Sequence, residues 1–300
     1  MSLILNQIHK IDNEIDSSYQ IRNQGRTDDK VIQMWLYGKS NHTQRGYQRD
    51  VSEFLEYIEL ESLREVRLED LQDFSNFLEE KGLADSTRAR KLSAIKSLFS
   101  FANKIGYLYY NVGTPIQTPK VKNRLGEKIL SEEEIFRMLA NTKNQRNYVL
   151  IRLMYVSGAR VSEICSLKWR DAQIHKDAGV LNIFGKGGKT RTVFLSPKTW
   201  EELIKLKKEA NQDDPIFESQ KGGHLDPSAA YRIVKKVAKK AGIDKEVSPH
   251  WLRHAHASHA LDKGVAPHVV RDTLGHSSIA TTNRYSHARP EDSSARSLSL

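Results

Sequence analysis

Residues 180–195 read VLNIFGKGGKTRTVFL, and this stretch decides the fold class of the second half of the chain. Val180 to Phe184 and Thr192 to Leu195 are rich in β-branched and aromatic residues, which favours two short strands. Gly185-Lys-Gly-Gly-Lys189 between them is the kind of glycine-rich turn that closes a β-hairpin. We therefore expect one small sheet in this half of the chain.

Helical periodicity surrounds this hairpin on both sides. Ser131 can cap a helix start, and Glu134 follows three residues later, as in a capping box. Apolar residues at helical spacing predict further helices over Tyr148–Val156, Ser162–Trp169, Trp200–Glu209, Ala229–Ala241, Trp251–Lys263, Val269–Leu274 and Ile279–Ser286. The fold class that follows is mainly α with a small β-sheet, an α+β domain.

The first part of the chain shows helical periodicity alone. From Thr43 to Ile58, and again from Leu68 to Leu78, apolar residues recur at the spacing of one helix face. A third helix is expected over Ser86–Asn103. Residues 1–27 keep no such period, so we expect an uncertain, loosely ordered arm there.

The helix expected over Ser86–Asn103 has a small, basic face. From Ser86 to Lys104 there are five Lys or Arg and no acidic residue. Such a face can lie against DNA phosphates. The candidate DNA-binding residues of this helix are Arg88, Arg90, Lys91 and Ser97. A solvated helix face is the alternative, and both stay open.

Length and charge indicate two domains and a polyanionic partner. The chain has 300 residues and a net charge of +10, which favours nucleic acid as the partner. Residues 1–110 hold 15 Lys or Arg against 17 Asp or Glu, whereas residues 111–300 hold 32 against 20. A charged stretch with two prolines makes 113–129 a linker. The expected domains are a helical DNA-binding domain over 28–112 and a catalytic domain over 130–300.

The sequence shows no sign of export or of a membrane segment. No stretch approaches 18 consecutive apolar residues, and residues 1–15 lack the pattern of a signal peptide. The single cysteine, Cys165, has no partner for an internal disulfide and is expected to be a small buried residue. We expect a cytoplasmic protein that associates with the nucleoid and not with a membrane.

Polar clusters in the second half could together hold a phosphodiester without a metal ion. Breaking that bond builds negative charge on the phosphate oxygens, which preorganised cations stabilise. Arg160 and Arg253 are the candidates, because a planar guanidinium meets two phosphate oxygens at once and stays charged. His250 and His276 can donate hydrogen bonds to the phosphate or accept a proton near neutral pH.

The glycine-rich turn supplies a candidate proton donor. Lys186 can protonate a 5′ leaving oxygen, which an arginine cannot do. Lys189 and Arg191 are nearby rivals of Lys186, and both are also candidate DNA contacts. The alternative is a basic turn that merely steers the DNA backbone.

Tyr285 is the candidate nucleophile. It follows His276 by nine residues and falls in an expected short helix. Deprotonating a phenol of pKa near 10 costs about 4 kcal/mol at neutral pH, which a nearby base and a cationic pocket can offset. Ordinary amphipathic packing is the alternative explanation of a tyrosine at this place.

Four segments resemble, in order, the signature segments of the tyrosine recombinase family, which includes phage integrases and Xer-like resolvases. They are Ala-Arg-Val-Ser-Glu at 159–163, Gly-Lys-Gly-Gly-Lys at 185–189, His-Trp-Leu-Arg-His at 250–254 and Leu-Gly-His-Ser-Ser-Ile-Ala-Thr-Thr-Asn-Arg-Tyr at 274–285. The resemblance implies that Arg160, Arg253, His250 and His276 bind the phosphate, that Lys186 is the general acid and that Tyr285 is the nucleophile. For Glu163 it implies a supporting salt bridge to the first arginine.

The resemblance also implies how such a protein is built and acts. A SAM-like helical domain and a catalytic domain would clamp double-stranded DNA at specific recombination sites. Four copies would assemble on two synapsed sites, whereas the free protein would be a monomer or weak dimer. Strands would be exchanged through 3′-phosphotyrosine intermediates without ATP or a cofactor. Tails in this family dock on neighbouring subunits, for which residues 287–300 offer little apolar surface.

Three other functions stay open beside this one. His250, His254, His256 and His259, with His276, could form a metal site, although the nearby arginines would repel a divalent ion. A type IB topoisomerase uses similar chemistry to relax DNA. A DNA-binding protein without catalysis would need the basic surface alone. The residues name neither the target sequence nor the choice among integration, excision, inversion and dimer resolution.

Overall fold

The computed structural model describes residues 27–59, 62–121, 125–185, 188–276 and 278–286. The chain divides into two compact units, residues 1–123 and 124–300, which are described in turn. This division falls inside the stretch 113–129 that the sequence predicts as a linker. Apart from Thr27, the expected arm lies outside the described residues, and so does the tail after Ser286.

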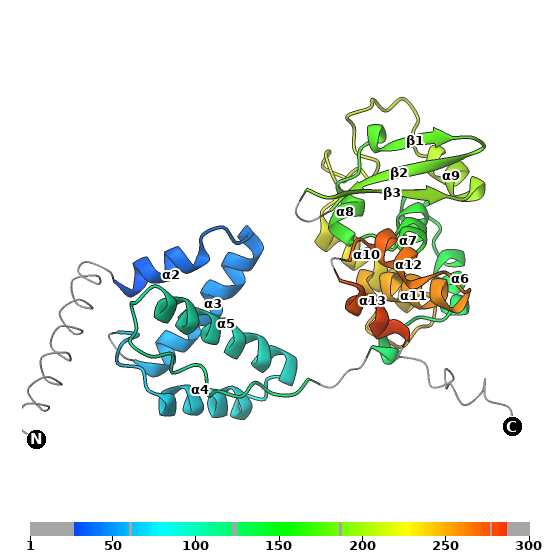
Figure 1. Ribbon diagram of the computed structural model, residues 1–300. Helices are drawn as coiled ribbons and strands as arrows, with labels where there is room; N and C mark the ends of the chain where they lie inside the picture. Colours follow the sequence, from blue (N-terminus) through cyan, green and yellow to red (C-terminus); the bar gives the residue numbers. More distant parts are fainter. Residues whose placement is uncertain (1–26, 60–61, 122–124, 186–187, 277, 287–300) are drawn as a thin grey trace, which may run out of the picture. The chain divides into compact units, whose positions relative to one another are not determined.

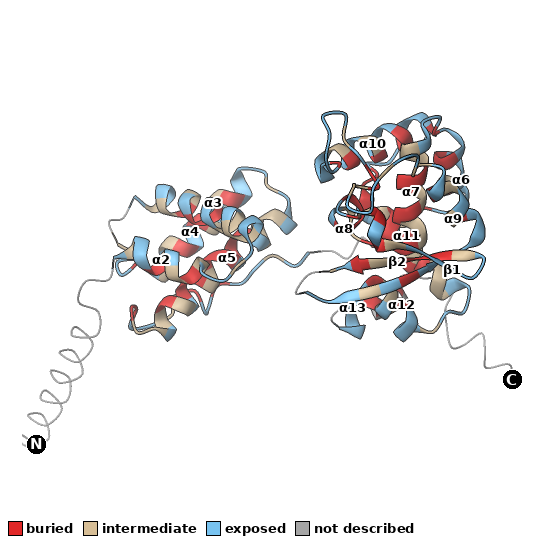
Figure 2. Ribbon diagram, turned by 90° about the horizontal axis from the view of Figure 1, so that it is seen from above, coloured by how far each residue is buried: buried red, intermediate tan, exposed pale blue. Residues whose placement is uncertain are grey.

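The described part of the first unit is a group of packed helices. They are α2 (Asp28–Leu36), α3 (Asn41–Ile58), α4 (Leu68–Glu80) and α5 (Asp85–Lys104) (Figure 1). Their apolar faces meet around Phe54, whose ring lies edge-on to Phe74 and Phe99 at centroid distances of 5.1 and 6.2 Å. Figure 2 shows buried residues on the facing sides of these helices. The three helices expected here are confirmed.

The sequence pattern does not predict helix α2. Thr27 caps this helix by accepting a hydrogen bond from the backbone N–H of Lys30 at 3.3 Å. Its buried residues are Val31 and Trp35, two positions that are too few to establish a period. The Trp35 ring stacks on Tyr47 with 5.0 Å between the centroids, which anchors α2 on α3. Tertiary packing thus stabilises a helix that local signals leave undecided.

The second unit is mainly helical, as expected. Its described α-helices are α6 (Glu132–Ala140), α7 (Gln145–Ser157), α8 (Val161–Cys165), α9 (Pro197–Ile204), α10 (Pro227–Lys240), α11 (Pro249–Asp262), α12 (Pro267–Leu274) and α13 (Ile279–Ser286). Two short 3-10 turns, η1 (Gly126–Lys128) and η2 (Trp169–Asp171), complete the set. The capping box of α6 is confirmed, because Ser131 and Glu134 exchange hydrogen bonds of 3.1 and 2.9 Å.

One antiparallel sheet lies beside these helices (Figure 1). Its strands are β1 (Ala172–His175), β2 (Ala178–Phe184) and β3 (Thr190–Leu195), in the order β1-β2-β3. Leu181 of β2 pairs with Ala172 on one side and with Val193 on the other. The β2–β3 hairpin is therefore confirmed, whereas β1 was not expected. Strand β1 is short and mostly exposed, so its sequence lacks a clear apolar alternation.

Two helices are shorter than the sequence predicts, and backbone pairing replaces the end of one of them. Helix α8 ends at Cys165, which is buried as expected, and the chain beyond it pairs with residues 212–216. Trp169 donates to the carbonyl of Asp214 at 3.1 Å, and Ile216 donates to that of Leu167 at 3.0 Å. Helix α9 ends at Ile204 and does not reach Glu209.

Helices α7 and α11 pack together in the core of this unit, and a glycine lets them approach α12. Helix α7 ends at Gly158 with φ of +57°. A Cβ atom on Gly158 would lie 2.5 Å from Leu274 Cδ2 and 2.8 Å from His256 Cδ2. The turn after α7 therefore requires glycine, and it brings Arg160 beside α11 and α12.

Candidate active site

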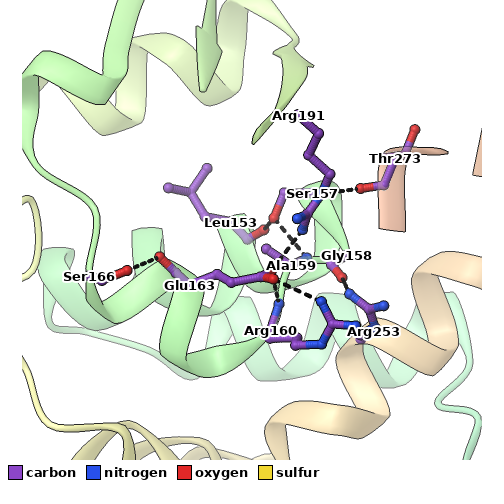
Figure 3. Close-up of polar contacts among 10 residues, drawn as sticks. All are labelled: Leu153, Ser157, Gly158, Ala159, Arg160, Glu163, Ser166, Arg191, Arg253 and Thr273. Atoms are coloured by element: carbon purple, nitrogen blue, oxygen red, sulfur yellow. Dashed lines mark hydrogen bonds and ion pairs between the residues drawn. The ribbon is translucent and has the colours of Figure 1, made fainter. Parts of the chain in front are cut away.

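Arg160 stands in the turn between α7 and α8, where it forms the N-cap of α8. Its backbone N–H donates to Glu163 Oε2 at 2.8 Å, and its guanidinium donates to Oε1, also at 2.8 Å. The Glu163 side chain is 5% exposed, whereas that of Arg160 is 36% exposed. The salt bridge therefore fixes Arg160 on one side and leaves part of its side chain open to solvent (Figure 3).

Arg253 reaches the same turn from α11. Its side chain is buried, and Nη1 donates to the carbonyl oxygen of Gly158 at 2.7 Å. Burial, followed by the nearby charge of Arg160, lowers the pKa of Arg253 to about 10, so the guanidinium keeps its charge at neutral pH. Two arginines that are distant in sequence thus meet at Gly158 (Figure 3).

His250 and His276 belong to the same electrostatic environment. His250 lies in the first turn of α11, and desolvation together with Arg253 and Arg160 lowers its pKa. His276 follows Gly275, the left-handed residue that ends α12, and burial and the same two arginines lower its pKa to about 4. Its Nδ1 lies 2.9 Å from the hydroxyl oxygen of Thr282. Both rings are therefore predominantly neutral at pH 7.

Tyr285 lies on α13 and is 4% exposed. Its ring packs with Leu125, Ala257, Val270 and Leu274, and its hydroxyl oxygen lies 2.8 Å from Nδ1 of His254. The structure thus places His254 at the phenol. Sequence reasoning named His254 as a ligand of the alternative metal site and not as a catalytic residue, although it directly follows Arg253 and stands one helical turn after His250.

Arg191 lies inside the unit, although the sequence suggested a DNA contact or a rival of Lys186. Its side chain is 11% exposed, and Nη2 donates to Glu163 Oε2 at 2.8 Å. Its Nε donates to the carbonyl of Thr273 at 2.6 Å (Figure 3). Burial alone would raise the pKa of Glu163, but the hydrogen bonds from Arg191 and Arg160 outweigh it and hold this pKa below 4.5.

The two lysines of the hairpin turn are placed differently. Lys186 lies outside the described residues, so its role stays a prediction. Lys189 is exposed, and its carbonyl accepts a hydrogen bond from the backbone N–H of Gly185 at 2.8 Å, which closes the turn. Its contact with DNA also stays a prediction.

The face of α5 that was expected to be open and basic is covered in part by carboxylates of other helices. Arg88 pairs with Glu79 of α4 at 2.5 Å and is 12% exposed. Arg90 and the buried Lys91 both pair with Asp50 of α3, and Lys91 also pairs with Glu53. The Ser97 hydroxyl accepts a hydrogen bond from the Trp35 indole at 3.1 Å.

These contacts change what the face of α5 can offer to DNA. The acidic residues come from α3 and α4, so a count along α5 alone misses them. Arg90 remains 49% exposed, which leaves it the most accessible cation of the set. The roles of all four residues in DNA binding stay predictions.

Two further histidines of α11 both contact Tyr155. His256 Nδ1 lies 2.8 Å from the carbonyl oxygen of Tyr155, and His259 Nδ1 lies 3.0 Å from the Tyr155 hydroxyl. Within the described ranges, no group of three or more His, Cys, Asp or Glu side chains could hold a metal ion. The described helices also include none that is long and apolar enough to cross a membrane.

Both units match known families. Residues 128–292 match the phage integrase family, and residues 34–106 match the phage integrase N-terminal SAM-like domain. Tyrosine recombinase XerC of Thermodesulfovibrio yellowstonii is 32% identical over 265 residues, which cover 83% of this chain and 87% of the relative. Tyrosine recombinase XerD of Oceanobacillus iheyensis is 33% identical over 266 residues, which cover 83% and 89%.

Solved structures share the fold. The XerH site-specific recombinase bound to a palindromic difH substrate, in a post-cleavage complex, has a TM-score of 0.74 at 24% identity, covering 92% of this chain and 85% of that one. A lambda integrase tetramer bound to a Holliday junction has a TM-score of 0.73 at 18% identity, covering 92% and 82%. With the family match over residues 128–292, these similarities show that the chain belongs to the phage integrase family of tyrosine recombinases, enzymes that cleave and rejoin DNA at specific sites.

Proposed function

We propose that this chain recombines double-stranded DNA at specific sites, with Tyr285 as the nucleophile. The observation that carries the proposal is the 2.8 Å distance between the Tyr285 hydroxyl and Nδ1 of His254, the residue next to the buried Arg253. A nucleophile that touches an acid–base group beside a preorganised cation is the arrangement that nucleophilic catalysis requires. The family of the chain supports the same reaction class.

In the proposed cleavage step, the phenolic oxygen of Tyr285 attacks the scissile phosphorus while its proton passes to Nδ1 of His254. A tyrosine–phosphorus bond forms, the bond to the 5′ oxygen breaks, and Lys186 gives that oxygen a proton. The product is a 3′-phosphotyrosine and a free 5′ hydroxyl. Because the number of phosphoester bonds is unchanged, rejoining by a 5′ hydroxyl needs no ATP.

Arg160 and Arg253 carry the electrostatic part of this proposal. Their guanidinium groups would bind the non-bridging oxygens, and losing one such donor typically costs about 3–4 kcal/mol of transition-state stabilisation. His276 would also bind the phosphate, because its Nδ1 lies by Thr282 and leaves Nε2 for a phosphate oxygen. His250, which is exposed in the first turn of α11, would add a further hydrogen bond.

DNA with specific recombination sites is the proposed partner, and a homotetramer on two synapsed sites is the proposed assembly. The net charge of +10 supports a polyanionic partner. Structures of the same fold include XerH bound to difH and a lambda integrase tetramer on a Holliday junction. We further propose that the free chain is a monomer or weak dimer, and that it works at the nucleoid in the cytoplasm.

A covalent trapping assay tests the proposed reaction. The Tyr285→Phe protein would first enrich its binding sites from a randomised duplex pool. Nicked suicide duplexes with these sites should then trap the wild-type chain in an adduct that resists denaturant and forms in the presence of a chelator. The Tyr285→Phe protein should form none. An adduct with this variant would reject Tyr285 as the nucleophile.

A matched tyrosine serves as the control for this assay. The Tyr155 hydroxyl also lies against a histidine of α11, at 3.0 Å from His259 Nδ1, but Tyr155 is not the proposed nucleophile. The Tyr155→Phe protein should therefore still form the adduct.

A reaction between two separate duplexes, each with its own site, distinguishes recombination from relaxation of the topoisomerase type. Exchange of flanking DNA between them is the expected result, whereas relaxation of supercoiled DNA without exchange would favour the alternative.

A further inference from the structure

His256 binds the end of α7 from the neighbouring helix α11. Its Nδ1 lies 2.8 Å from the carbonyl oxygen of Tyr155. Because a carbonyl oxygen only accepts, Nδ1 carries the hydrogen and donates it. Tyr155 belongs to the last turn of α7, where backbone carbonyls have no partner within the helix. The imidazole therefore caps the C-terminus of α7, the helix that leads into the turn of Arg160.

Arg253 donates to the same helix end from one turn earlier on α11. Its Nη1 reaches the carbonyl oxygen of Gly158 at 2.7 Å (Figure 3). The two donors stand three residues apart on α11, and so do the two carbonyls that accept from them, at Tyr155 and Gly158. Residues three apart on a helix share a face. A single hydrogen bond would let the end of α7 turn about it, whereas two bonds fix its orientation.

The His256 ring also sets the position of Gly158 by direct contact. A Cβ atom on Gly158 would lie 2.8 Å from Cδ2 and 3.1 Å from Cγ of this ring, and 2.5 Å from Leu274 Cδ2. Gly158 therefore packs tightly against both the imidazole and Leu274. Arg160 follows two residues later, as the N-cap of α8. A change in the place of the ring would thus move the backbone that carries Arg160.

We propose that His256 is a positioning residue that holds Arg160 and Arg253 in place to bind the scissile phosphate. The inference rests on the proposed function, since it assumes that these two arginines bind the non-bridging oxygens. His256 acts through the turn at Gly158, whose backbone leads to Arg160 and whose carbonyl oxygen accepts from Arg253. Burial lowers the pKa of His256 to about 4, so the ring is neutral at pH 7 and donates its one N–H to Tyr155. The ring has no second N–H with which to bind the phosphate itself.

Two substitutions separate the donor of His256 from its shape. His256→Phe keeps a flat ring beside Gly158 but loses the N–H, whereas His256→Asn keeps an N–H donor close to the place of Nδ1. Single-turnover cleavage of the suicide duplex should slow about a hundredfold in His256→Phe, the effect of roughly 1 Å of misplacement. His256→Asn should cleave clearly faster than His256→Phe. A normal rate in His256→Phe, or an equal loss in both variants, would overturn the proposal.

A duplex with a methylphosphonate at the scissile position separates positioning of the arginines from a general structural role. The methyl group replaces one non-bridging oxygen, so the scissile group carries no negative charge and needs less stabilisation from cations. The loss in His256→Phe should therefore shrink to about tenfold or less on this duplex. Both rates come from the same protein sample, so any unfolded fraction cancels in their ratio. An equal loss on the two duplexes would count against the proposal.

The control is His259→Phe. His259 stands on the same helix and contacts the same tyrosine, but its Nδ1 lies 3.0 Å from the hydroxyl oxygen of Tyr155 and not at the backbone carbonyl. Removing this contact leaves the end of α7 in place, so His259→Phe should cleave both duplexes at close to the wild-type rates. A loss in His259→Phe as large as that in His256→Phe would contradict the proposal. Failure of the wild-type chain to form any adduct would instead reject the proposed function.

Discussion

The Glu163→Gln change tests the ion-pair network at the centre of the site. The carboxylate is buried and accepts from the Arg160 backbone at Oε2, from the Arg160 guanidinium at Oε1 and from Arg191 at Oε2, each at 2.8 Å. Glutamine keeps the shape but removes the charge, and its NH₂ group must face one of the donors. One hydrogen bond is therefore replaced by a donor–donor contact.

The structure sets the expected size of this effect. Breaking a buried ion pair typically costs about 3–5 kcal/mol. The Arg160 side chain is 36% exposed, so solvent screens its attraction to Glu163. The Arg191 side chain is 11% exposed, so its attraction to Glu163 is screened less. The amide oxygen can also keep the two bonds at the Oε2 position. We therefore expect the free energy of unfolding to fall by about 2–3 kcal/mol at pH 7.

The pH dependence of this difference has a definite sign. The pKa of Glu163 is held below 4.5 in the folded chain, so its ionisation stabilises the fold above pH 4.5. Protonation of the Glu163 carboxylate removes this stabilisation as the pH falls below that value and through the lowered pKa of Glu163. The wild type and the Glu163→Gln protein should therefore approach each other in stability under acid.

Urea unfolding of the full chain measures these differences. Trp169, Trp200 and Trp251 report on the second unit, whereas Trp35 reports on the first. Each unit is treated as its own transition, because two units need not unfold together. Glu134→Gln is the control, since glutamine keeps the capping box and the change removes an ion pair with Lys245 outside the site, which should cost at most about 1 kcal/mol. A Glu163→Gln loss no larger than the control, or a gap that widens in acid, would refute the reasoning.

Three further predictions concern α11. Arg253→Lys should slow single-turnover cleavage by a hundred- to a thousandfold, because one ammonium cannot replace a fork that also donates to Gly158. His254→Phe should slow cleavage by at least about a hundredfold near neutral pH, and a rate–pH profile should show part of the loss recovered as the phenol ionises. Burial lowers the pKa of His256 to about 4, so the unfolded chain binds its proton first as the pH falls. The unfolding free energy should therefore drop by about 2 kcal/mol from pH 7 to 5 on account of His256, and by less in the His256→Gln protein; an identical drop in both would contradict this.

Local signals account for the parts of the fold that the sequence predicts. The β2–β3 hairpin follows from its glycine-rich turn, and the start of α6 follows from Ser131 and Glu134. Strand β1 depends instead on pairing with β2, since its own residues show no alternation. The end of α8 depends on backbone pairing with residues 212–216, which are far away in sequence. Such contacts form only in the folded chain.

The same distinction applies to the site. Motif spacing selects Arg160 and Arg253, and both prove to lie at the turn of Gly158. It does not show that Arg191 faces inward, because that depends on how β3 packs against α8 and α12. Nor does it show that His254 meets Tyr285, since the two residues are brought together by the packing of α13 on α11.

Mapping the covalent bond tests the central claim most directly. The adduct of the wild-type chain with a suicide duplex can be digested with nuclease and protease, and mass spectrometry can locate the nucleotide remnant. We predict a remnant linked through a 3′ phosphate to the hydroxyl oxygen of Tyr285. A remnant on any other residue, or one linked through a 5′ phosphate, would contradict the account.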